Sequence, residues 1–269
     1  MKALSFYTAN KHRVFHTDYP DSEKNIVTIA IPEIAIVMPF YNPGADWLKN
    51  FVACSKMLNE ELAGNAKLKY IIVNDGSYNA DLDKEVMRLC VQMDNLSYVT
   101  YKQNAGKGHA LREGVKASGC QYTITMDIDF PYANKDVTNI ISLLLQGFDV
   151  VTGKRDAMYF DNLPFERKII SKTFILMNRL FFKLPVYDTQ AGIKGFSEKG
   201  KTVFLQTTIS RFLADTEFIM RAYQQGLSLE VIPIHLRRGI EFSNFGSNTI
   251  ITELKNFLKL VKLSRQKAN

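Results

Sequence analysis

Two aspartates close a short β-branched run, Tyr122-Thr-Ile-Thr-Met-Asp-Ile-Asp129. The run predicts a buried strand, because β-branched side chains suit a pleated and covered surface. Since side chains alternate along a strand, Asp127 and Asp129 would point to the same side at its carboxyl end. Such carboxylates repel each other unless a divalent cation lies between them, and hard oxygen ligands suit Mg²⁺ or Mn²⁺. By spacing alone, a solvated acidic loop is an equal alternative.

The segments around this run alternate between strands and helices. Predicted strands cover residues 34–38, 68–73, 96–101 and 149–152, with a weaker candidate at 26–31, and predicted helices cover 45–61, 81–93, 109–117 and 137–146. This alternation is typical of βαβ units. It predicts an α/β fold, Rossmann-like, with a mostly parallel central sheet and helices on both faces.

Ligands of such sheets bind beyond the carboxyl ends of the strands. Five polar residues of this chain follow predicted strand ends: Tyr41, Asp75, Lys107, Asp127 and Asp129. Scattered polar residues would not share that location by chance. The shared location therefore favours a metal and ligand site over the solvated loop.

The second half of the chain is less regular. Predicted helices cover 165–184, 198–205, 215–225 and 249–263, a loop at 186–196 leads into a strand, and a late strand covers 229–235. We see no internal repeat and no low-complexity linker. The interpretation is an N-terminal extension at 1–25, one large domain at 26–248, and a C-terminal amphipathic basic helix and tail at 249–269.

The composition is that of an ordinary globular protein, with 269 residues, 46% hydrophobic residues and a net charge of +7. A basic protein attracts phosphorylated molecules and lipid headgroups, whereas no nucleic-acid-binding motif is present. Cys54, Cys90 and Cys120 lack metal-site spacing and indicate reduced thiols of a cytoplasmic protein. Neither a signal peptide nor an apolar run of bilayer length is found, so we expect no membrane crossing.

Several short segments occur in a fixed order along the chain. They are Met38-Pro-Phe-Tyr-Asn42, Val73-Asn-Asp-Gly-Ser77, Asn104-Ala-Gly-Lys-Gly108, Met126-Asp-Ile-Asp129, Thr152-Gly-Lys-Arg155, Arg167 with Ser171 and Asn178, Asp188-Thr-Gln-Ala-Gly192, and Asp215-Thr-Glu217. Together they resemble the family 2 glycosyltransferases of GT-A fold. Among these, the chain is most similar to the polyprenyl-phosphate or dolichol-phosphate mannose and glucose synthases, over nearly its whole length.

The resemblance implies a nucleotide-sugar donor of the GDP-mannose or UDP-glucose type. The implied donor-site residues are Pro39, Tyr41, Asp75, Lys107, Asp127 and Asp129. The first three would hold the base and ribose, and the lysine would lie against the diphosphate or a carbonyl of the base. The last two would hold a metal that neutralises the departing diphosphate. The alternatives are loop packing for Tyr41, a turn residue for Asp75 and a solvated lysine.

The acceptor implied by the resemblance is a polyprenyl phosphate. Arg155 and Arg167 would clamp its phosphate through paired hydrogen bonds, and Ser171 lies one helical turn after Arg167. A phosphate oxygen is already anionic, so a strong general base is not essential. If the acceptor is instead a glycan hydroxyl, Asp215 is the best general base. The alternatives are a helix N-cap for Asp215 and a surface charge for Arg167.

Four residues depart from the family pattern: Pro43, Asn74, and the adjacent Phe130 and Pro131. The family often has a glutamine where Pro131 stands, and this glutamine helps to hold the metal. The metal shell would then consist of Asp127 and Asp129 with phosphate and water. The hypothesis is an inverting, metal-dependent transferase acting on a polyprenyl phosphate. The alternatives are transfer to a glycan hydroxyl and a catalytically silent nucleotide-binding protein.

The C-terminal helix carries apolar residues at helical spacing and lysines on its other faces. The apolar set is Ile250, Ile251, Leu254, Phe257, Leu258 and Val261, and the basic set is Lys255, Lys259, Lys262, Arg265 and Lys267. One interpretation is peripheral contact with the inner face of the membrane, on anionic lipid. The other is a helix packed on the domain by its apolar stripe.

Overall fold

The computed structural model describes residues 7–9, 12–14, 28–29, 31–155, 159–160, 163–237 and 247–265. Its main sheet contains β4 (Glu33–Phe40), β5 (Lys67–Asp75), β6 (Leu96–Tyr101), β7 (Tyr122–Thr125), β8 (Val150–Arg155), β9 (Lys194–Phe196) and β10 (Leu229–Ile234). The strand order is β10-β8-β9-β7-β4-β5-β6. Only β9 runs antiparallel to its neighbours in this sheet of the described residues. The predicted mostly parallel sheet is confirmed.

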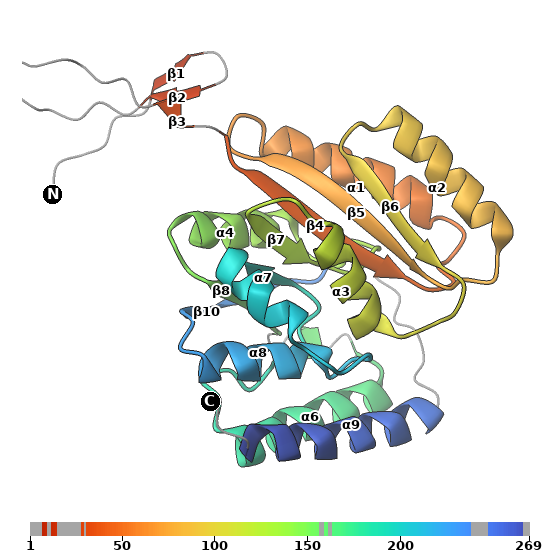
Figure 1. Cartoon of the computed structure of the whole chain (residues 1–269), viewed down its shortest axis with the longest axis vertical. Helices are drawn as coiled ribbons and strands as arrows, with labels where there is room; N and C mark the ends of the chain where they lie inside the picture. Colours follow the sequence, from red (N-terminus) through yellow and green to blue (C-terminus); the bar gives the residue numbers. More distant parts are fainter. Residues whose placement is uncertain are drawn as a thin grey trace, which may run out of the picture.

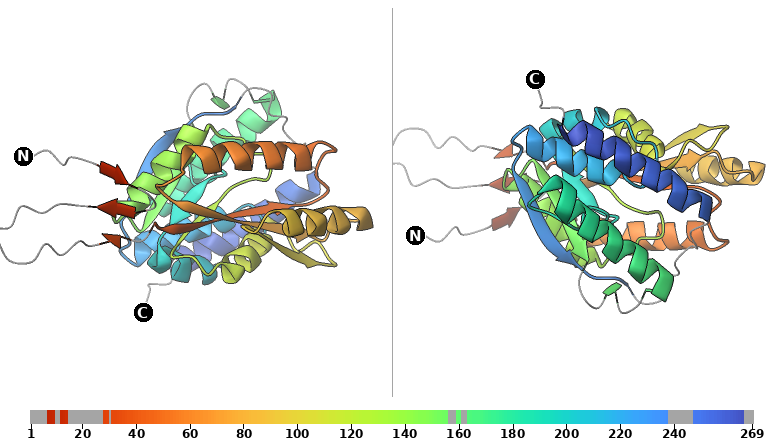
Figure 2. Two further views of the ribbon diagram at one scale, coloured as in Figure 1. Left: turned by 90° about the horizontal axis from the view of Figure 1, so that it is seen from above. Right: turned by 90° about the horizontal axis from the view of Figure 1, so that it is seen from below.

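Helices cover both faces of this sheet (Figures 1 and 2). They are α1 (Trp47–Glu61), α2 (Ala80–Gln92), α3 (Lys107–Ala117), α4 (Asn134–Leu145), α6 (Phe165–Phe182), α7 (Glu198–Leu205), α8 (Ala214–Gln224) and α9 (Ser247–Arg265). Each falls within a few residues of the helix predicted for it.

Strand β4 shows why both faces must be covered. Its residues from Ile34 to Met38 are all fully buried, so the run is apolar throughout instead of alternating. Ile34, Ile36 and Met38 belong to the core shared with α1, α2 and α4. Ala35 and Val37 face the opposite core, which α3, α7 and α8 build and to which α9 contributes Phe257 and Leu260.

The N-terminal segment forms a separate small sheet. Strands β1 (Tyr7–Ala9), β2 (His12–Val14) and β3 (Thr28–Ile29) pair antiparallel in that order. The weaker strand predicted at 26–31 is thus present in part as β3, and it pairs with β2 instead of joining the main sheet. The other residues of the predicted N-terminal extension lie outside the described part of the chain.

Strand β7 is shorter than the sequence predicted. It ends at Thr125, so Asp127 and Asp129 lie in the following turn, and Phe130 closes that turn at a φ of 49°. Alternation along a strand therefore does not explain how these carboxylates are oriented.

No helix within the described ranges is long and apolar enough to cross a membrane.

Candidate active site

A cleft of about 480 Å³ lies beyond the carboxyl ends of β4, β7 and β8. The loop at 39–44 and Trp47 line one part of it, and the turn at 127–132 lines another. Arg155, Ser171 and Asp215 line the remainder, together with residues of the loop between α6 and β9. Parallel strands thus deliver the polar residues to one edge of the sheet, where such sheets bind ligands.

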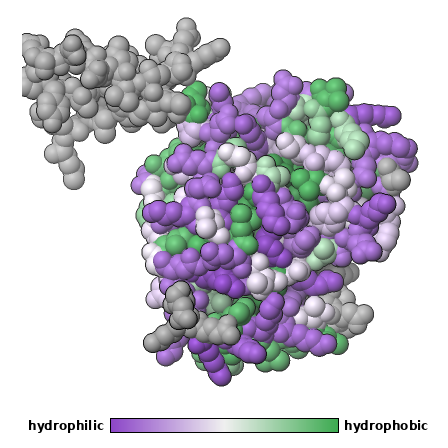
Figure 3. Space-filling model, viewed as in Figure 1, coloured by the Kyte–Doolittle hydropathy of each residue, from purple (hydrophilic) through white to green (hydrophobic). Residues whose placement is uncertain are grey.

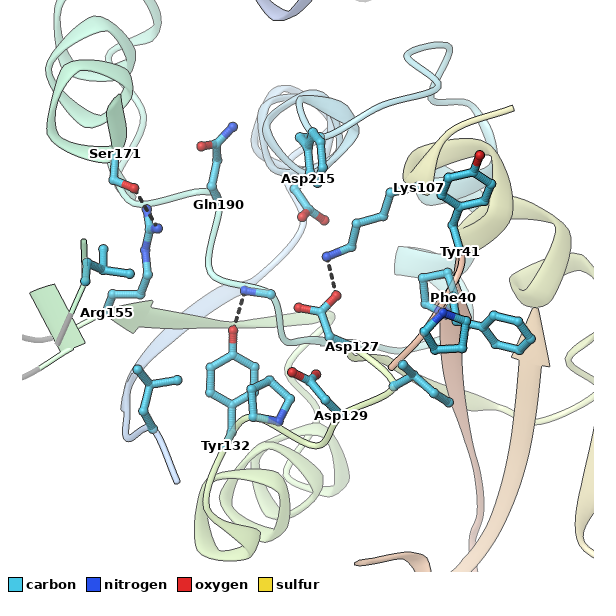
Figure 4. Close-up of a pocket in the computed structure, with 18 of the residues that line it drawn as sticks. Phe40, Tyr41, Lys107, Asp127, Asp129, Tyr132, Arg155, Ser171, Gln190 and Asp215 are labelled. Atoms are coloured by element: carbon cyan, nitrogen blue, oxygen red, sulfur yellow. Dashed lines mark hydrogen bonds and ion pairs between the residues drawn. The ribbon is translucent and has the colours of Figure 1, made fainter. Parts of the chain in front are cut away.

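The cleft brings Asp127, Asp129 and Lys107 together (Figure 4). The Lys107 Nζ donates to Asp127 Oδ1 at 2.5 Å. Burial acts against the charge of this ammonium, yet Asp127 and the other cleft carboxylates raise the pKa of Lys107 to about 12. Withdrawal from bulk water and the neighbouring Asp127 raise the pKa of Asp129 to about 6. The arrangement is a pair of carboxylates balanced by one lysine.

These two carboxylates suit a hard divalent cation that keeps other oxygen ligands. Among the described residues, the cleft included, no group of three or more His, Cys, Asp or Glu side chains has metal-site geometry, so protein side chains alone would not complete the shell of a metal. Mg²⁺ is commonly held by one or two carboxylates, with water and substrate phosphate completing its shell. Asp127 and Asp129 fit that role, and Pro131 lines the cleft without offering a side-chain oxygen.

Glycine is required where the loop from Asp188 to Gly192 passes the first aspartate. A Cβ added to Gly192 would lie 2.6 Å from Asp127 Oδ2 and 2.7 Å from Tyr132 Oη. The Gly192 N–H also donates to Tyr132 Oη at 2.8 Å. The Tyr132 hydroxyl thus holds the Gly192 backbone beside Asp127, and sequence reasoning did not single out Tyr132.

Asp75 lies outside the residues that line the cleft, unlike the other predicted donor-site residues. Its buried carboxylate accepts hydrogen bonds from Tyr101 Oη at 2.7 Å, Asn104 Nδ2 at 2.9 Å, and the N–H groups of Ala105 and Gly106 at 2.8 and 2.9 Å. In this structure Asp75 therefore fixes the loop that leads into Lys107. A direct contact between Asp75 and a nucleotide stays a prediction.

Pro39 and Tyr41 both line the cleft. The Tyr41 ring is partly exposed and meets the ring of Tyr78 edge to face, with 6.0 Å between centroids. Asn42 joins the two loops, since its N–H donates to Ser77 Oγ at 2.9 Å and its Oδ1 accepts from the Tyr78 N–H at 3.2 Å. An accessible aromatic face beside the cleft is what base stacking requires.

Arg155 is buried and already has an anionic partner. Its Nη2 lies 2.6 Å from Asp188 Oδ1, its Nε lies 3.0 Å from both Asp188 oxygens, and its Nη1 donates to Ser171 Oγ at 3.3 Å. Burial opposes the charge, but Asp188 raises the pKa of Arg155. The predicted clamp thus includes Asp188, and only one edge of the guanidinium faces Ser171. The side chain of Arg167 lies outside the described residues, so its role stays a prediction.

Asp215 does not cap α8, because the N-cap is Leu213 and Asp215 lies within the first turn. That alternative was wrong. Asp215 Oδ1 instead lies 3.2 Å from the Nζ of Lys194, which is fully buried and also donates to the Ala191 carbonyl at 2.6 Å. Burial lowers the pKa of Lys194, while Asp215 favours its charge. Sequence reasoning missed Lys194, whose only signal is a charge inside an apolar strand.

Glu217 has a structural role in α8. It is fully buried and accepts from the N–H groups of Thr208 and Ile209, each at 2.8 Å, and from Arg221 Nε at 2.9 Å. Its carboxylate is therefore engaged away from the cleft. A different glutamate, Glu253 of α9, lines the cleft and was not anticipated.

An uncharacterized protein of Methanocaldococcus jannaschii is 28% identical over 239 residues, covering 85% of this chain and 91% of that protein. The dolichyl-phosphate beta-glucosyltransferase of Dictyostelium discoideum is 24% identical over 214 residues, covering 75% of this chain and 65% of that enzyme.

Two solved structures share the fold at low sequence identity. Mannosyl-3-phosphoglycerate synthase from Rubrobacter xylanophilus superimposes with a TM-score of 0.61 at 14% identity, covering 87% of this chain and 75% of that one. Glucosyl-3-phosphoglycerate synthase from Mycobacterium tuberculosis, in complex with Mn²⁺, UDP and glucosyl-3-phosphoglycerate, gives 0.55 at 15% identity, covering 87% and 78%. Residues 35–200 match the sequence profile of glycosyl transferase family 2, which is more than half of the chain. The protein therefore belongs to glycosyl transferase family 2 and is a glycosyltransferase of GT-A fold.

Proposed function

We propose that this protein transfers a hexose from a nucleotide-sugar to a polyprenyl phosphate with inversion, using Mg²⁺ or Mn²⁺. One observation carries the proposal: a single cleft holds the Asp127–Asp129 pair and the Arg155–Ser171 group. The first set suits a metal-bound diphosphate, and the second suits a phosphate. The dolichyl-phosphate glucosyltransferase relative supports the acceptor class, and the Mn²⁺–UDP complex of a structural neighbour supports the donor chemistry.

The donor binds with its base on Tyr41 and its diphosphate toward Lys107 and the two aspartates. When bound, the metal neutralises the charge that collects on the departing nucleotide diphosphate. Lys107 stays protonated because its pKa is about 12, so its ammonium can leave Asp127 and contact the diphosphate instead. In this proposal the donor is of the GDP-mannose or UDP-glucose type.

The acceptor phosphate binds on the opposite side of the cleft, at Ser171 and at Nη1 of Arg155, the guanidinium nitrogen that faces Ser171. Its oxygen is already anionic, so it attacks the sugar carbon opposite the leaving diphosphate without a strong base. Asp188 keeps Arg155 in place, since it contacts the guanidinium at two nitrogens. Arg167 completes the clamp in this proposal.

A second candidate is transfer to a glycan hydroxyl. It is favoured by one observation, because Asp215 lines the same cleft and could accept a hydroxyl proton. A catalytically silent nucleotide-binding protein is the remaining alternative, and it would bind the donor without releasing its nucleotide.

Radiolabelled nucleotide-sugar, Mn²⁺ and a polyprenyl phosphate test the proposal directly. We expect a lipid-linked radioactive product whose formation Asp127→Asn reduces about a hundredfold or more, as for loss of a charge-stabilising contact. Asp81→Asn, on the exposed face of α2, is the matched control and should leave product formation unchanged. Product on a glycan but none on the lipid would establish the second candidate instead, and donor binding with no product would establish the silent one.

A further inference from the structure

Helix α6 exposes an apolar stripe of four large side chains. Phe165, Ile169, Leu176 and Leu180 are between 49% and 77% exposed. Their spacings of four, seven and four residues place them on one face of the helix. Single exposed apolar residues are normal, but an aligned set of four large ones marks an interaction surface.

Helix α9 extends this surface. It packs beside α6 through Phe257, which meets the rings of Phe181 and Phe182. Both helices face the viewer when the molecule is seen from below (Figure 2, right), and apolar surface shows at the lower edge of the space-filling view (Figure 3). The buried side of α9 packs on the domain, while Ile251, Leu254 and Leu258 are between 48% and 70% exposed.

Basic residues accompany both stripes. Lys172 and Arg179 are exposed on α6, and Lys255, Lys262 and Arg265 are exposed on α9. Their helical angles place them beside the apolar residues, where long basic side chains can reach outward to charged headgroups. A second copy of the chain is a poor occupant, because a twofold interface would set these like charges against each other. Anionic lipid complements both the apolar stripe and the charge.

The position of α6 connects this surface with the cleft. Ile170, Ser171 and Phe174 line the cleft from the side of α6 that is turned away from the stripe. One helix therefore separates the acceptor-phosphate group from the exposed apolar face. We propose that α6, together with α9, seats this protein on an anionic bilayer surface, with the α6 stripe at the boundary of headgroups and acyl chains. The inference rests on the proposed function only in that the acceptor is carried by lipid.

The test is co-sedimentation of the full chain with vesicles. We expect binding to phosphatidylcholine mixed with phosphatidylglycerol, weaker binding to phosphatidylcholine alone, and loss of binding at high salt. The double variant Leu176→Gln and Leu180→Gln keeps helix propensity while removing two apolar anchors. Its vesicle affinity should fall about tenfold or more.

A matched control exists on α2, where Met87 and Val91 have the same spacing and similar exposure. Met87→Gln with Val91→Gln should bind vesicles like the natural protein, because α2 lies at the far end of the molecule from α6 (Figure 1). Equal loss in both double variants, or binding unaffected in the α6 variant, would overturn the assignment. So would a dimer in sedimentation velocity that the α6 variant abolishes.

Activity on a short, water-soluble polyprenyl phosphate separates this inference from the proposed function. Without vesicles, the α6 double variant should form product at the natural rate, because neither leucine contacts the cleft. Vesicle binding without any product from the natural protein would refute the proposed function and leave the membrane surface standing. Product without vesicle binding would refute the membrane surface alone.

Discussion

Lys107 and Lys194 each pair with a cleft carboxylate, but they differ in their freedom to move. The Lys107 side chain is 21% exposed and its partner Asp127 is 38% exposed, so ligands can reach this pair. Lys194 is 1% exposed and held by both Asp215 and the Ala191 carbonyl. In the proposed function Lys107 exchanges Asp127 for the donor diphosphate, whereas Lys194 stays in place and links α8 to the loop at Ala191.

The buried pair can be broken with Lys194→Met. The substitution leaves the Asp215 carboxylate buried without its cation, which typically costs about 3–5 kcal/mol. We expect the free energy of unfolding in urea to fall by about 3 kcal/mol. Lys199→Met is the control, since Lys199 is exposed and 3.7 Å from Asp149, and should change stability by less than about 1 kcal/mol.

Adding Asp215→Asn to this variant tests the coupling between the two residues. The neutral amide no longer needs a cation, so the double variant should recover part of the lost stability. If the two losses simply add, Lys194 and Asp215 are not an energetic pair.

At the scale of elements, the sequence predicts which segments form strands but not how the loops beyond them pack. The amino-acid composition of the run Leu96–Tyr101 is enough to predict a strand, and the strand is observed with the same bounds. Strand β9 has three residues, too few for a periodicity, so neither its antiparallel direction nor the burial of Lys194 was predictable. The Arg155–Asp188 pair joins residues 33 positions apart, and nothing local in the sequence encodes it.

The loop before β9 can be tested with Gly192→Ala. The added methyl group would collide with Asp127 Oδ2 and displace this carboxylate. We expect the affinity for Mn²⁺ in the presence of UDP, measured by calorimetry, to fall about tenfold or more, as for other contacts that orient metal ligands. Gly119→Ala places its methyl group in open space and should leave the affinity unchanged. Unaltered affinity in folded Gly192→Ala would show that Asp127 does not hold the metal.

The contact between α8 and α9 predicts a pH dependence of stability. Burial raises the pKa of Glu253 above its ordinary value of 4.5, although the Leu213 N–H, at 3.2 Å, favours the ionised form. In the interval above 4.5 the folded chain retains a proton that the unfolded chain releases, so stability falls as pH rises through it. The ionised Glu253 carboxylate therefore lowers the stability of the folded chain at neutral pH.

Glu253→Gln removes the buried charge and keeps a side-chain oxygen that can accept a hydrogen bond from the Leu213 N–H. We expect a higher melting temperature than the natural protein at pH 7, with the difference shrinking toward zero as pH approaches 4.5. Thermal scans across this pH range measure it. A difference that is constant with pH would mean that the effect comes from packing and not from ionisation.

At the scale of the whole molecule, the sequence predicted the sheet and its helices because their apolar periodicities are local. The predicted strand ends located Tyr41, Lys107 and Asp127 in the cleft, and the resemblance added Arg155, which lies there too. Local patterns could not show that the Asp75 carboxylate accepts hydrogen bonds from the loop before Lys107, since its partners lie 26 to 31 residues further along the chain. Local patterns also could not show which apolar residues of α9 are buried in the core and which are exposed, because both sets recur at helical spacing.

The contribution of α9 to the whole fold can be tested through Leu260. This side chain is fully buried in the core that α9 shares with α3, α7 and α8. Leu260→Ala leaves a cavity and should lower the free energy of unfolding by about 2–5 kcal/mol. Leu258→Ala is the control, because Leu258 is 70% exposed and its truncation should change stability little.

The same variant decides whether α9 unfolds together with the rest of the chain. Trp47, the single tryptophan, lies in α1 on the other side of the sheet from α9. If the described domain is one cooperative unit, its fluorescence and the far-ultraviolet circular dichroism must report one unfolding midpoint, shifted equally by Leu260→Ala. If Leu260→Ala shifts the midpoint measured by circular dichroism but not the midpoint measured by Trp47 fluorescence, α9 unfolds independently of the rest of the domain. In that case membrane binding through α6 could proceed with α9 detached.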